Sequence, residues 1–97
     1  MPAASLACIA HCQQLLAQGD TSLSPCLKAA LDVNAVTEAL LKLAGWSSTQ
    51  AAPLAKASLP VYLACADACK EHAAHHAQCK ACREACLAII AAVQAMG

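Results

Sequence analysis

Aromatic side chains are almost absent from this chain of 97 residues, which has one Trp, one Tyr and no Phe. β-Sandwiches and barrels are built largely from aromatic and β-branched residues. Ala and Leu, which dominate this sequence, are instead among the best helix formers. The composition therefore excludes a typical all-β domain and predicts an all-α protein.

Charged residues are also scarce, at 12%, and six basic residues are balanced by six acidic ones. Hydrophobic residues make up 60% of the chain. Intrinsic disorder is excluded, because it requires low hydrophobicity and high net charge. A chain with no net charge also lacks the basic field that attracts nucleic acid or an anionic membrane surface. We therefore expect neither of these partners.

Long apolar runs are missing as well, since polar residues interrupt every stretch before the ~20 residues needed to cross a bilayer. The first residues lack the basic start and the apolar core of a secretory signal. We therefore expect a cytoplasmic protein, in a compartment that keeps thiols reduced. Eight cysteines in such a chain indicate metal binding or catalysis rather than a disulfide framework.

Four helical segments are expected, over about residues 3–18 and 24–44, from 47–49 to a break around 75–77, and over 78–95; Gly and Pro mark every break but the last. Gly19 ends the first segment, and we expect Ser24 and Ser47–Thr49 to provide the N-caps of the next two. Pro60 should kink or divide the third helix, because it removes a backbone donor. Four such segments with short joints are typical of an antiparallel four-helix bundle, and the length fits a single domain over residues 1–97.

The cysteines of the second half lie on two narrow helical faces. These cysteines are Cys65, Cys69, Cys79, Cys82 and Cys86. On an ideal helix the first two share a face with His72 and His76, and the other three share a face that continues to Ile90. Charged residues occupy the positions between them. Both faces are therefore expected to point inward.

The two cysteine faces mirror each other about a turn near His75. Residues equidistant from the turn of an antiparallel hairpin lie at the same height. The pairs expected from this symmetry are Cys65 with Cys86, Cys69 with Cys82, and His72 with Cys79. Thiols that face one another along a hairpin indicate a metal-binding or redox function.

The first half adds Cys8 and Cys12 on one face of the first helix, and Cys26 near the start of the second. Cys12 and Cys26 lie seven residues on either side of Gly19, so we expect them at the same height across that turn. All eight cysteines can thus point into the core. The alternative is that cysteine acts only as a small buried hydrophobic residue, and for Cys26 alone this alternative is equally good.

The clearest motifs are Cys65-Ala-Asp-Ala-Cys69 with the following His72 and His76, Cys79-Lys-Ala-Cys82-Arg-Glu-Ala-Cys86, and the N-terminal Cys8-Ile-Ala-His-Cys12. These motifs resemble those of the copper storage proteins, a family of cysteine-rich four-helix bundles. The resemblance implies inward thiolates that bind many Cu(I) ions, each held mainly by two sulfurs. It also implies that His side chains near one end help copper to enter.

By position, the resemblance makes every cysteine a copper ligand. The implied residues are Cys8, Cys12, Cys26, Cys65, Cys69, Cys79, Cys82 and Cys86, with His72 or His76 at the entrance. Members of the family usually carry more cysteines, whereas here Val33, Leu40 and Leu63 occupy inward or near-inward positions. We therefore expect a Cu(I)-binding protein that sequesters, buffers or stores copper at a lower capacity than its cysteine-richer relatives.

The residues alone leave the metal open. Soft thiolates select Cu(I), Zn(II) or iron–sulfur clusters. The two cysteine–cysteine mirrored pairs contain four thiolates that can bind one tetrahedral zinc ion. These residues are Cys65, Cys69, Cys82 and Cys86. Successive facing pairs along a helical hairpin are ~6 Å apart, and this spacing suits a row of two-coordinate Cu(I) ions better than one compact zinc centre. A structural or thiol-redox helical bundle that binds no copper is the alternative.

Other features of the sequence add little to this hypothesis. The sequence shows no nucleophile–base arrangement, phosphate-binding loop or paired carboxylate site, so we do not expect an enzyme. We interpret His11 and His75 as surface residues. Ala-rich outer faces are compatible with a homodimer or homotetramer.

Overall fold

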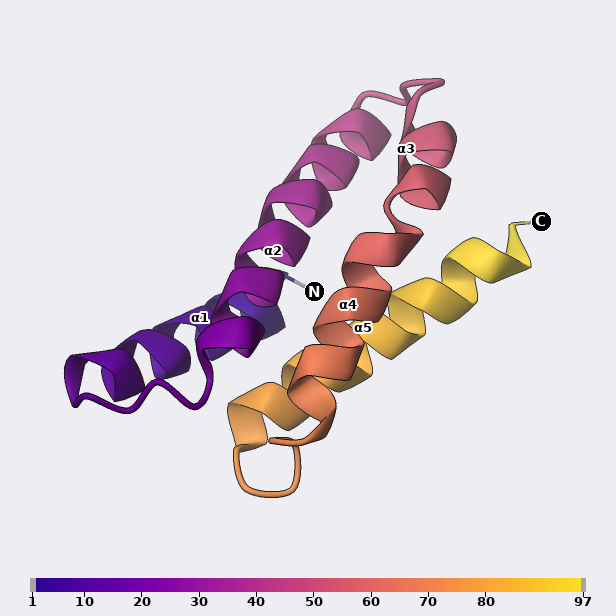
Figure 1. The fold of residues 1–97 in the computed structure, drawn as a ribbon. Helices are drawn as coiled ribbons and strands as arrows, with labels where there is room; N and C mark the ends of the chain where they lie inside the picture. The colour runs from indigo at the N-terminus through magenta and orange to yellow at the C-terminus, as the bar shows by residue number, and fades with distance from the viewer. Residues whose placement is uncertain (1, 97) are drawn as a thin grey trace.

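The computed structural model describes residues 2–96, which form five helices and no strand (Figure 1). The helices are α1 (Pro2–Ala17), α2 (Ser24–Gly45), α3 (Ala51–Ala57), α4 (Leu59–Lys70) and α5 (Ala77–Ala95). The all-α class expected from the composition is confirmed. No helix in the described part of the chain is both long and apolar enough to span a membrane.

Pro60 divides the third expected segment into two helices, as predicted. It lies in the first turn of α4, where a missing backbone N–H leaves no hydrogen bond unmade. Ser58 separates α3 from α4, and its hydroxyl donates to the carbonyl of Leu54 at 2.6 Å. The expected break around residues 75–77 starts earlier than predicted, because α4 ends at Lys70, residues 71–76 form a turn and α5 begins at Ala77.

The expected N-caps are slightly misplaced. Leu23 precedes α2 and Gln50 precedes α3, and neither makes a side-chain capping hydrogen bond. The Ser48 hydroxyl instead accepts the backbone N–H of Gln50 at 3.1 Å, inside the turn that leads to α3. Gly19 ends α1 as expected, and its φ of 85° lies in the left-handed region that glycine adopts without strain.

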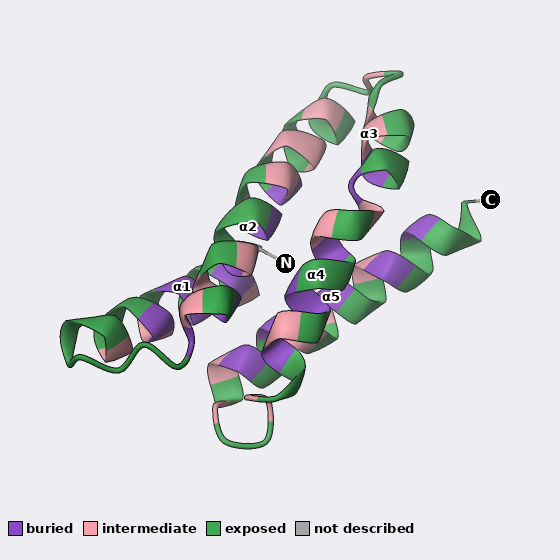
Figure 2. Cartoon of the chain, viewed as in Figure 1, coloured by how far each residue is buried: buried purple, intermediate pink, exposed green. Residues whose placement is uncertain are grey.

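The helices pack in two pairs that share one hydrophobic core. α4 lies against α5 and α1 against α2, while contacts of α2 with α4 and of α1 with α5 join the pairs (Figure 1). The buried residues lie mainly on the sides of these helices that face one another (Figure 2). The described chain is elongated, with extents of 44 × 21 × 17 Å, so the core is narrow.

Tyr62 is fully buried at the start of the inward row of α4, and its hydroxyl lies 2.8 Å from that of buried Thr37 on α2. Val33 is buried and Leu40 is half-buried, as expected. The inward placement of Leu63 is wrong, since this side chain is 51% exposed. The inward row of α4 runs through residues 62, 65 and 69, and a residue one position after 62 is rotated ~100° away from it.

Candidate metal centre

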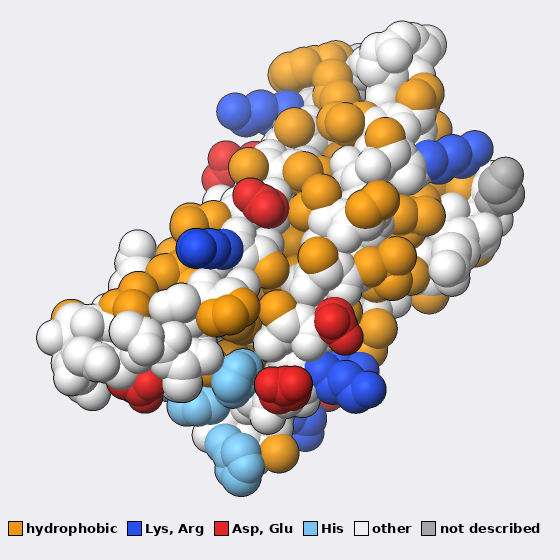
Figure 3. Space-filling view, in the orientation of Figure 1, with side chains coloured by type: hydrophobic (Ala, Val, Ile, Leu, Met, Phe, Trp, Pro, Cys, Tyr) orange, Lys and Arg blue, Asp and Glu red, His pale blue; other side chains and the backbone are white. Residues whose placement is uncertain are grey.

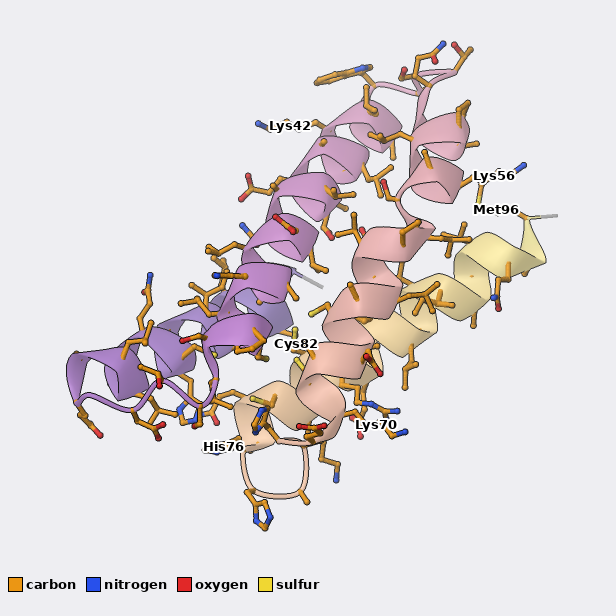
Figure 4. All side chains as sticks on the ribbon, viewed as in Figure 1. Lys42, Lys56, Lys70, His76, Cys82 and Met96 are labelled. Carbon is orange, nitrogen blue, oxygen red and sulfur yellow. The ribbon has the colours of Figure 1, made fainter. Side chains whose placement is uncertain are left out.

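All eight cysteines are buried with free thiols, and none is more than 1% exposed. Four helices contribute to the set. Cys8 and Cys12 come from α1, Cys26 from α2, Cys65 and Cys69 from α4, and Cys79, Cys82 and Cys86 from α5. Figure 4 shows Cys82 among the helices, away from the ends of the molecule. Sequence segments far apart in the chain therefore bring their thiols into one core.

The sulfur of Cys26 lies at the centre of the contacts between helices. It is 2.8 Å from the sulfur of Cys69, 3.5 Å from that of Cys8 and 3.9 Å from that of Cys79. A single residue of α2 thus touches thiols of the other three cysteine-bearing helices.

The sulfurs gather in three groups, each made of three atoms that lie within 4.8 Å of one another. The groups are Cys8, Cys26 and Cys79; Cys8, Cys69 and Cys82; and Cys65, Cys82 and Cys86. Cys8 and Cys82 each belong to two groups, so the groups share atoms. Cys12 belongs to none, but its sulfur is 4.0 Å from that of Cys8. The thiols therefore form one continuous chain from Cys12 to Cys86.

Both mirrored cysteine pairs of the α4–α5 hairpin are brought together. Each expected partner pair shares one of the sulfur groups, and Cys65 also lies 3.7 Å from Cys82. Cys79, which symmetry placed opposite His72, joins the group of Cys8 and Cys26.

The pairing expected across Gly19 is different from that observed. Cys8 rather than Cys12 belongs to a sulfur group with Cys26. Residues 18–23 form an irregular loop rather than a tight turn. Equal distance from Gly19 therefore does not set the height of a residue on α1.

Burial keeps part of the thiol chain protonated. Removal from water raises the pKa of Cys12 from 9.0 to about 11. It raises the pKa of Cys79 to about 12, and the charge of Cys26 acts in the same direction. A buried thiolate without a partner is costly, so the neutral thiol is favoured in the metal-free state. A metal that binds these residues must displace protons.

Hydrogen bonds between the sulfurs act in the opposite direction at two positions. Bonds with Cys69, and next with Cys8, lower the pKa of Cys26 to about 3. The pKa of Cys82 is likewise lowered, first by the bond with Cys65. The partner thiols carry the proton, and the pKa of Cys69 is raised by its bond with Cys26. Cys26 and Cys82, whose pKa values are lowered, thus each provide a hydrogen-bond-accepting sulfur inside one of the sulfur groups.

The histidines gather at one end of the molecule (Figure 3). Half-buried His76 lies just before α5, near the turn that follows α4 (Figure 4). Its Nδ1 is 2.9 Å from Nε2 of His11 on α1. The His72 and His76 ring centroids are 6.2 Å apart, and His75 is exposed.

His11, which we interpreted as a surface residue, is half-buried and makes a hydrogen bond with His76 that the sequence did not predict. Sequence reasoning missed it because its partner is 65 residues away. The available signal was its position beside Cys12, in the half of α1 nearest the loop.

A helical chain with a continuous set of buried thiols has the donors of the soft-metal-binding proteins, which is the class that this fold and site indicate. Comparison with the sequence models of protein families identifies the family. The sequence model of the copper storage protein family matches residues 1–97, which is the whole chain. The chain belongs to the copper storage protein family, as the cysteine motifs predicted. It is a copper-binding protein of a family that stores metal rather than transforming a substrate. No curated protein was found to match the chain.

Proposed function

We propose that this chain sequesters, buffers or stores copper as Cu(I), held by its buried thiolates. The observation that carries the proposal is the arrangement of the sulfurs in three connected groups of three. Cu(I) is a soft ion that thiolates select, and it accepts two or three sulfur ligands. The chain has no other set of donors so well shielded from water among its described residues.

The distances within the groups suit two- and three-coordinate ions. For a metal–sulfur bond of ~2.3 Å, opposed sulfurs lie ~4.6 Å apart and trigonal sulfurs ~4.0 Å apart. Every group falls within 4.8 Å, so little rearrangement is needed. Structural zinc instead needs four donors in a tetrahedron. The four cysteines of the mirrored pairs do not form one group, because Cys69 is grouped with Cys8 and Cys82. This arrangement favours Cu(I) over zinc.

The proposed ligands are the eight cysteines, with Cys8 and Cys82 shared between neighbouring ions. We assign His72 and His76 to the entrance, and the contact of His76 adds His11 to it. In this proposal α1, α2, α4 and α5 act as an antiparallel four-helix bundle in a single domain. The protein then works in the cytoplasm as a binder without enzymatic activity, and a dimer or tetramer is compatible with that role. The eight-cysteine set implies fewer ions than in cysteine-richer relatives.

The test is a titration of the fully reduced protein with Cu(I) under nitrogen, in the presence of a competing chromophoric chelator. We expect about three or more ions per chain to be retained, one for each sulfur group. A parallel titration with Zn(II) against a zinc indicator should show weaker retention. No retained copper, or one tightly held zinc ion in its place, would overturn the proposal in favour of a structural, redox or zinc-binding helical protein.

A further inference from the structure

A surface hollow lies on the α4–α5 hairpin and is lined by none of the cysteines. Its volume is about 330 Å³, and it is lined by Ala73, Ala74, Lys80, Arg83 and Glu84. The two alanines belong to the turn of residues 71–76, and the charged residues lie on successive turns of α5. The hollow is large enough for a small molecule, at the lower end of the range of ~300–1,000 Å³ for ligand sites.

The charged side chains of this hollow have no partners within the described chain. Nε of Arg83 is buried and makes no hydrogen bond there. Lys80 and Glu84, although four residues apart on one helix, form no ion pair, and neither does Arg83, among residues 2–96. Buried polar atoms in folded proteins almost always have a partner. The buried Nε is itself out of reach of a ligand, but the terminal nitrogens of the same guanidinium group are accessible and equally without a partner among residues 2–96. The group is therefore available to an external hydrogen-bond acceptor at the hollow.

The charges define the chemical class of that ligand. A guanidinium group binds a carboxylate through two parallel hydrogen bonds, and Lys80 adds a second positive charge beside Arg83. Glu84 on the same lining can accept an ammonium group. Two cations and one anion together match a small zwitterion with one ammonium group and more than one carboxylate. The small alanine side chains leave room for its backbone.

The hollow shares its turn with the histidines. Ala73 and Ala74 directly follow His72, and Figure 3 shows basic and acidic side chains beside the histidine end of the molecule. We propose that the hollow binds a small zwitterionic peptide thiol, the type of molecule that carries Cu(I), and holds it at the copper entrance. This inference rests on the proposed function. In the exchange, Cu(I) leaves the carrier sulfur for a cysteine sulfur, the cysteine proton moves to the carrier, and copper remains Cu(I).

The probe is S-methylglutathione, whose blocked sulfur separates docking from metal transfer. It is titrated into copper-free, reduced protein while backbone amide and Arg83 Nε–H signals are followed by NMR. We expect saturable shifts at residues 73–74 and 80–84. Arg83→Gln should weaken binding about tenfold or more, as expected when a charge-assisted contact is lost. Glu84→Gln should weaken it to a smaller degree, and Lys28→Gln, at an exposed position on α2, is the matched control that should bind normally.

Several outcomes would overturn the inference. These are no shifts at the hollow, equal binding by Arg83→Gln and Lys28→Gln, or displacement of the probe by equimolar inorganic phosphate, which would indicate a general anion site. Circular dichroism checks that the Arg83 variant folds, and Lys80→Gln replaces it if it does not. Copper capacity against a chelator is measured separately. Normal capacity without probe binding refutes this inference alone, whereas probe binding without capacity refutes the proposed function.

A kinetic arm uses two copper sources. Arg83→Gln should load several-fold more slowly from Cu(I)–glutathione but at the normal rate from a Cu(I)–acetonitrile complex. Equal slowing with both sources would mean that Arg83 acts on the entrance itself rather than on the carrier, and the inference would be wrong.

Discussion

Cys8 belongs to two of the three sulfur groups, whereas Cys12, one turn further along α1, belongs to none. The two residues therefore provide a matched pair of substitutions on the same helix. Both are almost fully buried, so Cys8→Ala and Cys12→Ala each remove about the same packing, at a cost of ~1 kcal/mol in the free energy of unfolding. Any difference between the variants in copper binding must come from the place of each sulfur in the chain of thiols.

Removing the Cys8 sulfur leaves two of the three groups with two donors each. In one of them, the remaining sulfurs of Cys26 and Cys79 are 3.9 Å apart. We expect Cys8→Ala to bind copper at these two groups at least about tenfold more weakly, a loss of ~1.4 kcal/mol or more per site. The group of Cys65, Cys82 and Cys86 should keep its affinity. Cys12→Ala should retain nearly the whole wild-type complement.

The assay is a competition between the reduced protein and graded concentrations of a chromophoric Cu(I) chelator under nitrogen. Binding curves of the wild-type protein and both variants are compared, and circular dichroism confirms equal helicity. Identical curves for the two variants would refute the assignment of copper to the sulfur groups. A larger loss in Cys12→Ala would mean that copper sits nearer the histidine end.

Three further predictions follow from the same site. Changing the four cysteines of the mirrored pairs to Ala together should abolish most Cu(I) binding at nearly unchanged helicity; a full copper complement would show that the hairpin is not the principal site. Replacing His72 and His76 with Phe should slow loading several-fold in stopped-flow experiments at neutral pH without changing the final stoichiometry, and an unchanged rate would place the entrance elsewhere. The metal-free protein should melt at lower temperature as the pH rises from about 9 to 12. The reason is that folding raises the pKa of Cys12 to about 11 and that of Cys79 to about 12, from 9.0 in the unfolded chain. Their contribution to the free energy of unfolding is fully present below about pH 9 and is lost as the pH rises through the folded pKa values. Cys26 is ionised in the folded state throughout this range and in the unfolded state above about pH 10, so its lowered pKa affects only the start of the range. A flat melting profile above about pH 10 would contradict the burial effect.

Helix positions were predictable where the chain carries a local signal. Gly19 and Pro60 mark breaks through backbone restrictions that hold in any context, and both breaks are observed. The end of α4 at Lys70 had no such signal, because residues 71–76 contain neither Gly nor Pro. At the other end of this turn, His76 precedes α5 in an extended conformation, with φ of −132° and ψ of 109°. Tertiary contacts, including the bond of His76 to His11, decide that conformation rather than local propensity.

The same distinction holds for the thiols. The pairs within the α4–α5 hairpin were predictable, because two helices joined by one turn keep the register that the sequence symmetry gives. The contacts of Cys26 with Cys69 and Cys8 join different helix pairs. They depend on how α2 lies against α4 and against α1, which no spacing along the chain encodes. The sequence thus predicts which thiols of the hairpin lie together, and packing between the helix pairs determines the other contacts.

A protein that stores metal must fold at every level of loading, and the core explains how this chain does so. Burial favours neutral thiols at Cys12 and Cys79, so the unloaded core avoids an uncompensated charge at these positions. A neutral cysteine then packs as a small hydrophobic residue. Val33 and Ile90 extend the core with side chains that bind no metal, and Tyr62 satisfies its hydroxyl on Thr37. These apolar contacts need no copper, so this part of the core does not depend on the metal.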